Sequence, residues 1–133
     1  MSVFHQITAA LMLPLLGVAI PSYAQGATKL PESANQHAYE ASRDIYTLLK
    51  ENDKFRVMLA TWKPGQSDEW HTHHGDLVNY NLTDCKLRGE LPDGRVATLE
   101  RKKGEAGFNI KNDVHKVTNV GDTECVLLIV ERK

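Results

Sequence analysis

The chain has 133 residues, of which 41% are hydrophobic and 25% are charged, as is typical of a single folded domain. Its formal net charge is −1, and no block of Lys or Arg stands out. The charge pattern therefore gives no reason to expect nucleic acid or an anionic membrane surface as a partner.

The first 24 residues have the pattern of a secretory signal peptide. An apolar run covers residues 7–20, and Ser22 and Ala24 place small residues three positions and one position before a cleavage site. The run is shorter than the roughly 20 apolar residues that span a membrane. We expect cleavage after Ala24 and a periplasmic or secreted protein that is not attached to a membrane. Because residues 1–6 contain no Lys or Arg, an uncleaved amphipathic tail or anchor is the alternative.

Two segments remain after the signal peptide. Residues 25–37 are polar and contain Pro31, and we expect a flexible leader there; residues 38–133 then form the folded domain. Cys85 and Cys125 lie in a chain that we expect to be exported, and disulfides persist in exported proteins. From composition alone, a disulfide and two buried free thiols are both open.

Short strands dominate the expected secondary structure. Ala38–Glu51 is ambiguous, because its first half has helical spacing, whereas residues 44–50 favour a strand. Alternating or apolar runs between Gly, Pro and Asp turns predict seven further strands: residues 54–63, 77–82, 86–91, 95–100, 108–110, 114–120 and 125–130. Many short strands at this spacing predict an all-β sandwich or barrel.

Three histidines within four positions mark the candidate site. His71 and His73 lie just ahead of an expected strand and point to one face of an extended chain, about 7 Å apart. His115 is the only later histidine, so it is the candidate third ligand of one metal ion. The alternative is a set of partly buried histidines bonded to backbone groups.

These residues resemble two motifs of the cupins, a family of small jelly-roll β-barrels. Three residues in register with the first motif are Gly65, His71 and His73, and three in register with the second are Gly104, His115 and Asn119. The first motif departs from the family at Val78 and Cys85, and the second at Ile110 and Asn112. The resemblance covers residues 54–131 and implies a single-domain cupin-type jelly-roll β-barrel.

The resemblance also implies a metal site. In cupins, two first-motif histidines, a Glu and the second-motif histidine commonly hold one divalent metal, often iron, manganese, nickel or zinc. Here the set would be His71, His73 and His115, with Val78 at the Glu position. Three neutral imidazoles leave the charge of the ion uncancelled and about three coordination positions open, which favours an anionic ligand. Some relatives, such as thiol dioxygenases, use three histidines without Glu, and others have lost the metal.

Three further polar residues are candidates near this site. If Val78 faces the interior, so does Tyr80, whose hydroxyl would be a catalytic donor to bound substrate; the alternative is core packing. Asp76 would orient a ligand imidazole or simply occupy a turn. His74 alternates away from His73, and we expect it at the exposed rim.

In a jelly roll, the strand leading to Cys85 lies antiparallel beside the one beginning near Cys125, so the resemblance predicts a disulfide between them. The family often forms dimers, which makes a homodimer one arrangement to test.

Two functions follow from the resemblance. The first is a metal-dependent, dioxygenase-like enzyme acting on a small anionic or enolisable substrate. The second is a non-catalytic periplasmic module that binds metal or a small ligand.

Overall fold

The computed structural model describes residues 29–109 and 114–133. The expected signal peptide lies outside these residues. Two short helices, η1 (Glu32–Asn35) and α1 (Ala38–Ala41), precede all the strands. The strands are β1 (Tyr46–Glu51), β2 (Phe55–Trp62), β3 (Leu77–Asn81), β4 (Cys85–Glu90), β5 (Val96–Arg101), β6 (Ala106–Asn109), β7 (Lys116–Asn119) and β8 (Cys125–Arg132).

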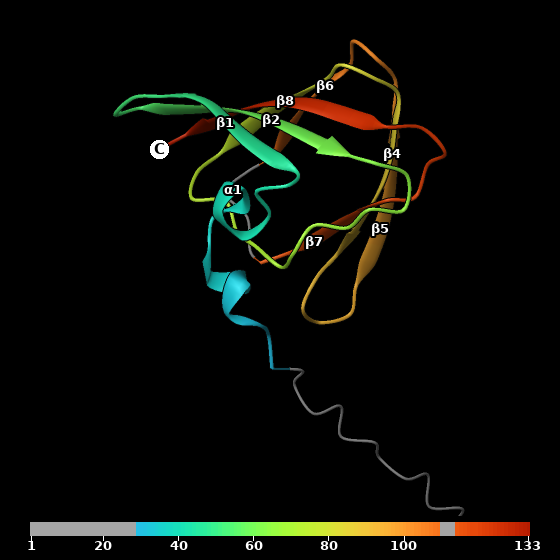
Figure 1. The fold of residues 1–133 in the computed structure, drawn as a ribbon, viewed down its shortest axis with the longest axis horizontal. Helices are drawn as coiled ribbons and strands as arrows, with labels where there is room; N and C mark the ends of the chain where they lie inside the picture. Colours follow the sequence, from blue (N-terminus) through green and yellow to red (C-terminus); the bar gives the residue numbers. More distant parts are fainter. Residues whose placement is uncertain (1–28, 110–113) are drawn as a thin grey trace, which may run out of the picture.

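The strands form two antiparallel sheets that face each other (Figure 1). One sheet has the order β1-β2-β8-β3-β6, and the other has the order β5-β4-β7. The expectation of an all-β jelly roll is confirmed, and so is a strand in the second half of residues 38–51. Pairing of β8 with both β2 and β3 places strands from distant parts of the chain at the centre of the larger sheet.

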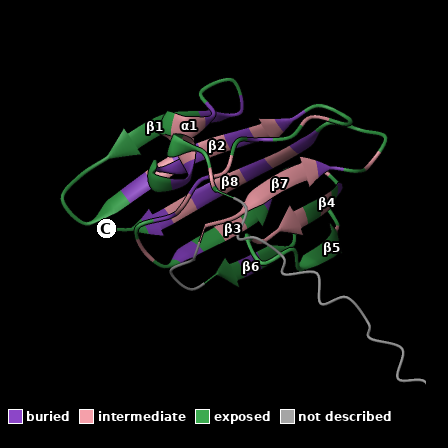
Figure 2. Cartoon of the chain, turned by 90° about the horizontal axis from the view of Figure 1, so that it is seen from below, coloured by how far each residue is buried: buried purple, intermediate pink, exposed green. Residues whose placement is uncertain are grey.

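Alternation along β2 and β8 builds the core. Met58 pairs with Ile129 and Ala60 pairs with Leu127, and all four side chains are buried between the sheets. Figure 2 shows the resulting stripes of buried and less buried residues along both strands. Burying one large apolar side chain contributes about 1.5–3 kcal/mol, so this register is strongly fixed.

Strand β3 alternates in the opposite sense from the sequence-based expectation. Leu77 and Asn81 are buried, whereas Val78 is 38% exposed and Tyr80 is 43% exposed. Val78 does not face the interior, so the condition under which Tyr80 was expected to reach a bound substrate is not met. The inward positions of β3 are Leu77, Asn79 and Asn81, all of which line the cavity described below.

The end of the expected flexible leader packs against the barrel. Ala34 is 3% exposed and His37 is 1% exposed, and the backbone N–H of Thr72 donates to the carbonyl of Gln36 over 3.0 Å. The leader prediction is therefore wrong for residues 32–37. Figure 1 shows this segment running alongside the barrel to α1, which packs against β1.

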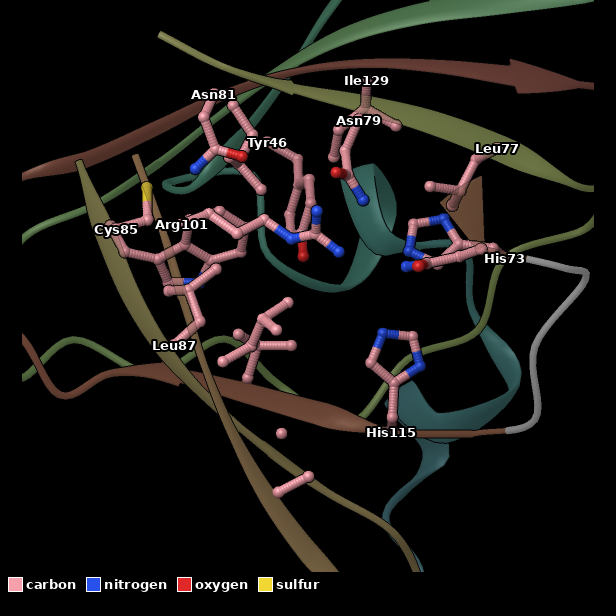
Figure 3. Close-up of a pocket in the computed structure, with 17 residues that line it drawn as sticks. Tyr46, His73, Leu77, Asn79, Asn81, Cys85, Leu87, Arg101, His115 and Ile129 are labelled. Carbon is pink, nitrogen blue, oxygen red and sulfur yellow. The ribbon is translucent and has the colours of Figure 1, made fainter. Parts of the chain in front are cut away.

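A cavity of about 270 Å³ lies between the two sheets (Figure 3). Apolar side chains from both sheets form most of its wall. Two imidazoles, those of His73 and His115, face it from one side, and the side chains of Asn79 and Arg101 also reach it.

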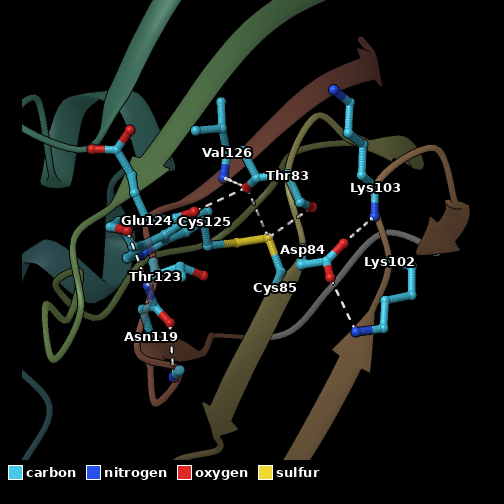
Figure 4. The surroundings of a disulfide bond; sticks show 12 residues. Thr83, Asp84, Cys85, Lys102, Lys103, Asn119, Thr123, Glu124, Cys125 and Val126 are labelled. Atoms are coloured by element: carbon cyan, nitrogen blue, oxygen red, sulfur yellow. Dashed lines mark hydrogen bonds and ion pairs between the residues drawn. A yellow bond between two sulfur atoms is a disulfide. The ribbon is translucent and has the colours of Figure 1, made fainter.

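A disulfide between Cys85 and Cys125 joins the beginnings of β4 and β8, as predicted (Figure 4). The hydroxyl of Thr83 beside it donates to the carbonyl of Glu124 over 3.0 Å and accepts the N–H of Val126 over 2.8 Å. The bond thus links the two sheets at the end of the barrel opposite His115. Within residues 29–109 and 114–133, no helix is long and apolar enough to cross a membrane.

Candidate metal centre

His71 and His115 face each other across an isolated antiparallel bridge. Each residue donates its backbone N–H to the carbonyl of the other over 3.0 Å, and their ring centroids lie 4.3 Å apart. The ring of His73 lies 5.2 Å from that of His71 and 5.4 Å from that of His115. One ligand nitrogen from each of the three rings lies within 4.8 Å of the others. The three histidines singled out in the sequence are therefore close enough to share one metal ion.

The surroundings of His71 leave one ring nitrogen available for that ion. The side chain is fully buried, and its Nδ1 lies 2.8 Å from the carbonyl oxygen of Glu69, to which it must donate. The lone pair is then on Nε2, which has no hydrogen-bond partner among the described residues. Burial, and then repulsion from His115 and His73, lower the pKa of His71 to about 2. A buried neutral imidazole with an unpartnered nitrogen fits a divalent metal.

A buried carboxylate orients His73. Its Nδ1 lies 3.1 Å from Oε2 of Glu131, so Nδ1 donates and Nε2 is left as the electron-pair donor. Glu131 is fully buried and also binds Nε2 of His37 over 2.6 Å and the backbone N–H of His74 over 3.0 Å. Burial opposes the charge of Glu131, but the hydrogen bonds from His37 and His73 outweigh it and hold its pKa below the usual range.

His37, His73 and Glu131 form a second group whose ligand atoms are close together. Their distances are those of hydrogen bonds, and the carboxylate already lies between the two rings. We therefore interpret this group as the support for His73 rather than as a second ion site. Arg56 adds a positive charge, with Nη1 3.5 Å from Oε1 of Glu131.

The hydrogen bonds of Glu131 depend on close packing between the loop after His74 and the end of β8. A Cβ at Gly75 would lie 1.6 Å from the carbonyl oxygen of Arg132, so only glycine allows the loop after His74 to approach the end of β8. That approach lets the backbone of His74 reach Glu131. Gly65 and Gly104, which open the two motifs, have φ of 77° and 90°, a conformation that favours glycine.

A second buried carboxylate lies behind His71. Asp68 accepts the hydroxyl of Tyr46 over 2.8 Å and the backbone N–H of Val117 over 2.6 Å, and its Oδ2 lies 3.7 Å from Nδ1 of His71. Burial raises the pKa of Asp68 to about 7, against the lowering effect of these two hydrogen bonds. Asp68 thus links the segment that contains His71 to β7, the strand that begins directly after His115.

The other polar residues singled out in the sequence lie away from the three imidazoles or at the surface. Tyr80 lies on the outer face of β3, which argues against a role on a substrate in the cavity. Asp76 forms an exposed pair with Arg132 at 3.1 Å, while Glu69 and Glu131 supply the hydrogen bonds that orient His71 and His73. The prediction that His74 lies exposed at the rim is confirmed.

Sequence reasoning missed His37 and Glu131. One signal could have found Glu131: it follows Leu127 and Ile129 at alternate positions, so it continues the inward face of β8. An acidic residue on an inward face requires a partner. His37 gave no such signal, because it is 94 positions from the carboxylate that it binds.

Val78 aligns with the Glu of the first cupin motif, but it does not face the proposed metal site as that Glu would. Val78 points outward, and the inward neighbours Leu77 and Asn79 occupy this part of the wall. Neither is a carboxylate, so the described ligand set still consists of neutral imidazoles.

Comparison with known proteins identifies the fold. No family model matches the chain, and neither does any curated protein sequence. Among solved structures, a cupin domain from Bordetella pertussis Tohama I is 28% identical, with a TM-score of 0.62 over 74% of this chain and 96% of that one. The polyketide cyclase RemF from Streptomyces resistomycificus is 26% identical, with a TM-score of 0.51 over 65% of this chain and 63% of that one.

A cupin superfamily protein from Desulfitobacterium hafniense DCB-2 is 14% identical, with a TM-score of 0.51 over 66% of this chain and 75% of that one, and supports the fold alone. The motif residues, the barrel and the similarities to the Bordetella and Streptomyces structures agree, and the chain belongs to the cupin superfamily.

Proposed function

We propose that this cupin binds one divalent metal ion through His71, His73 and His115 and uses it to act on a small anionic or enolisable molecule in the barrel cavity. The observation that supports this most directly is the unpartnered Nε2 of buried His71, within reach of the other two imidazoles in the described structure. Burying such a nitrogen without a partner is costly, and a metal ion would compensate for it.

The ligand set favours an anion as the molecule that binds next to the metal. Three neutral imidazoles cancel none of the charge of a divalent ion and leave coordination positions open. When bound, the ion supplies Lewis-acid chemistry or, as iron, a site at which substrate and dioxygen meet. Iron, manganese, nickel and zinc all accept imidazole ligands, so the proposal covers each of them.

The chain's own residues have supporting tasks. Glu131 and the carbonyl of Glu69 hold the proton on Nδ1 of His73 and of His71, which keeps the opposite nitrogen of each ring available. Apolar side chains such as Leu87 and Ile129 would pack against the body of a bound molecule and reduce its contact with water. Similarity to a protein described as a polyketide cyclase supports an enzymatic role on an organic substrate.

A second candidate is a non-catalytic module that captures metal or a small ligand. It is favoured by the wall of the cavity, where no Asp, Glu or Lys of the described residues is found. With Tyr80 outside, the groups there that could transfer a proton are imidazoles and the hydroxyl of Tyr46, and that hydroxyl is donated to Asp68. The disulfide supports a periplasmic or secreted location for either function.

Metal analysis of protein purified from its native compartment tests both candidates. We expect about one equivalent of a divalent transition metal per chain. If no metal co-purifies and none binds at micromolar concentration, the metal-dependent function and the capture of metal are both wrong, and only the capture of a small ligand without metal is left. Oxygen consumption by iron-loaded protein with a panel of small thiols and diketones then separates an enzyme from a binding module.

A further inference from the structure

We infer that Arg101 is the anion-binding residue of the barrel cavity and that the ligand is a small monocarboxylate with an apolar body. This inference deepens the proposed function, on which it rests for the class of molecule that enters the cavity, a small anion. It is argued from the position of Arg101, the free edge of its guanidinium, and the size and lining of the cavity.

Strand register places Arg101 on the inner face of its sheet. Arg101 pairs with Cys85, and Leu99 pairs with Leu87, and these four residues all line the cavity. The outward position between them, Glu100, instead forms an exposed ion pair with Lys86. A cation therefore occupies an inward position in a wall that is otherwise mainly apolar.

The guanidinium of Arg101 is held from one side only. Its Nη1 donates to the carbonyl of Ala106 over 3.1 Å, which fixes the group between β5 and β6. Its Nε is buried and has no hydrogen-bond partner within the described part of the chain. Nε and Nη2 form the edge of a guanidinium that binds a carboxylate with two parallel hydrogen bonds. The bond to Ala106 leaves this edge for a ligand.

Gly107 makes the room that this arrangement needs. A Cβ there would lie 2.8 Å from Nη2 of Arg101 and 2.7 Å from Oδ1 of Asn79. Oδ1 of Asn79 is also buried without a partner among the described residues. Figure 3 shows the side chains of Asn79 and Arg101 pointing into the same space as the imidazoles of His73 and His115. The unpartnered Nε of Arg101 and Oδ1 of Asn79 thus lie in the same part of the cavity wall.

The class of ligand follows from these features. A buried guanidinium N–H without a partner is costly, and an anion compensates for it. Arg101 is the single cationic side chain among the described residues that line the cavity, so one carboxylate matches it. A volume of about 270 Å³ lies just below the usual range for drug-sized ligands, which limits the ligand to a small molecule. Side chains such as Leu87, Leu127 and Ile129 surround the remainder, which favours an apolar body.

Benzoate and butyrate are suitable probes, and calorimetric titration of the zinc-loaded protein measures their binding. We expect Arg101→Met to weaken benzoate binding on the order of tenfold to a hundredfold, the range for hydrogen bonds to a charged group. Benzamide has the same shape as benzoate but no charge, and it should bind the wild type at least as weakly as benzoate binds Arg101→Met. The matched control is Arg95→Met, which removes an exposed arginine paired with Asp93 and should leave benzoate affinity unchanged.

A second variant covers the case in which Arg101→Met does not fold. Gly107→Ala retains Arg101 but displaces its guanidinium and the amide of Asn79, both of which are ends of flexible side chains. It should fold and bind benzoate several-fold more weakly than the wild type. Circular dichroism and thermal unfolding confirm the fold of each variant.

The results separate this inference from the proposed function. Benzoate affinity of Arg101→Met within twofold of wild type, or no binding of benzoate and butyrate to the wild type at millimolar concentration, overturns the inference even if zinc binds as proposed. Conversely, if zinc does not bind but metal-free protein binds benzoate in a manner that depends on Arg101, the metal function is wrong and the anion site stands.

Discussion

Replacing Glu131 with Gln tests how hydrogen bonds around His73 support the proposed metal site. The carboxylate is fully buried and forms hydrogen bonds of 2.6 Å with His37, 3.1 Å with His73 and 3.0 Å with the backbone of His74. Glutamine keeps the shape but replaces one acceptor oxygen with an NH₂ group. It therefore cannot accept from all three donors, and the charge that favours the proton on Nδ1 of His73 is lost.

The expected losses of zinc affinity and of unfolding free energy follow from the number of hydrogen bonds to Glu131 and from their burial. Loss of an orienting partner of a metal-bound histidine typically lowers metal affinity about 10–100-fold, or about 1.4–2.8 kcal/mol. The free energy of unfolding should also fall by about 1.5–3 kcal/mol, because hydrogen bonds to a buried charge are weakened. Arg56, 3.5 Å from the carboxylate, would then face a neutral group, which adds to the loss.

The assay is a competition titration of zinc between the protein and a chromophoric chelator, for the wild type and Glu131→Gln. Asp76→Asn is the matched control, because this exposed carboxylate pairs with Arg132 and its neutralisation should change zinc affinity less than twofold. Zinc affinity of Glu131→Gln equal to that of the wild type would refute the role of Glu131. A loss in Asp76→Asn instead would assign the orienting role to Asp76.

Three further outcomes are expected. His115→Ala should abolish stoichiometric zinc binding and leave the far-ultraviolet circular dichroism of the barrel intact; one equivalent of zinc retained in this variant would exclude His115 as a ligand. Replacing Cys85 and Cys125 together with Ser should lower the free energy of unfolding by about 3–4 kcal/mol, because the disulfide closes a loop with a sequence separation of 40; urea denaturation measures this, and an unchanged midpoint would argue against it. Tyr80→Phe should leave zinc affinity and any oxygen consumption unchanged, since this side chain is outside the cavity; a large loss of either would show that Tyr80 reaches the site.

Much of the fold was predictable because strand alternation and turn residues are local signals. The spacing of His71, His73 and His115 identified the three residues that the barrel brings together, since motif positions fix where each histidine enters the interior. The disulfide followed from the antiparallel arrangement that the fold imposes on the strands near Cys85 and Cys125.

The inward face of β3 was not predictable from hydrophobicity. Its more apolar face, with Val78 and Tyr80, points outward, and its polar face, with Asn79 and Asn81, lines the interior. A barrel that encloses a ligand cavity places polar groups inside, so the usual rule of apolar residues inside and polar residues outside fails at this strand. Arg101 on β5 is a second case of the same inversion.

The support around His73 could not be predicted because its parts are distant in the chain. His37 comes from the segment before α1, and Glu131 comes from the end of β8. No local pattern relates residues 94 positions apart, and their pairing depends on how the N-terminal segment packs against the barrel. A polar stretch such as residues 32–37 looks like a leader until its partner is known.

The central claim is that three imidazoles from separate parts of the barrel hold one metal ion. Anomalous diffraction from crystals of the zinc-loaded protein tests it most directly. We predict one strong peak at about 2.0–2.1 Å from a ring nitrogen of each of His71, His73 and His115. A barrel without a peak at this position, or with its strongest peak bound by other residues, would contradict the account.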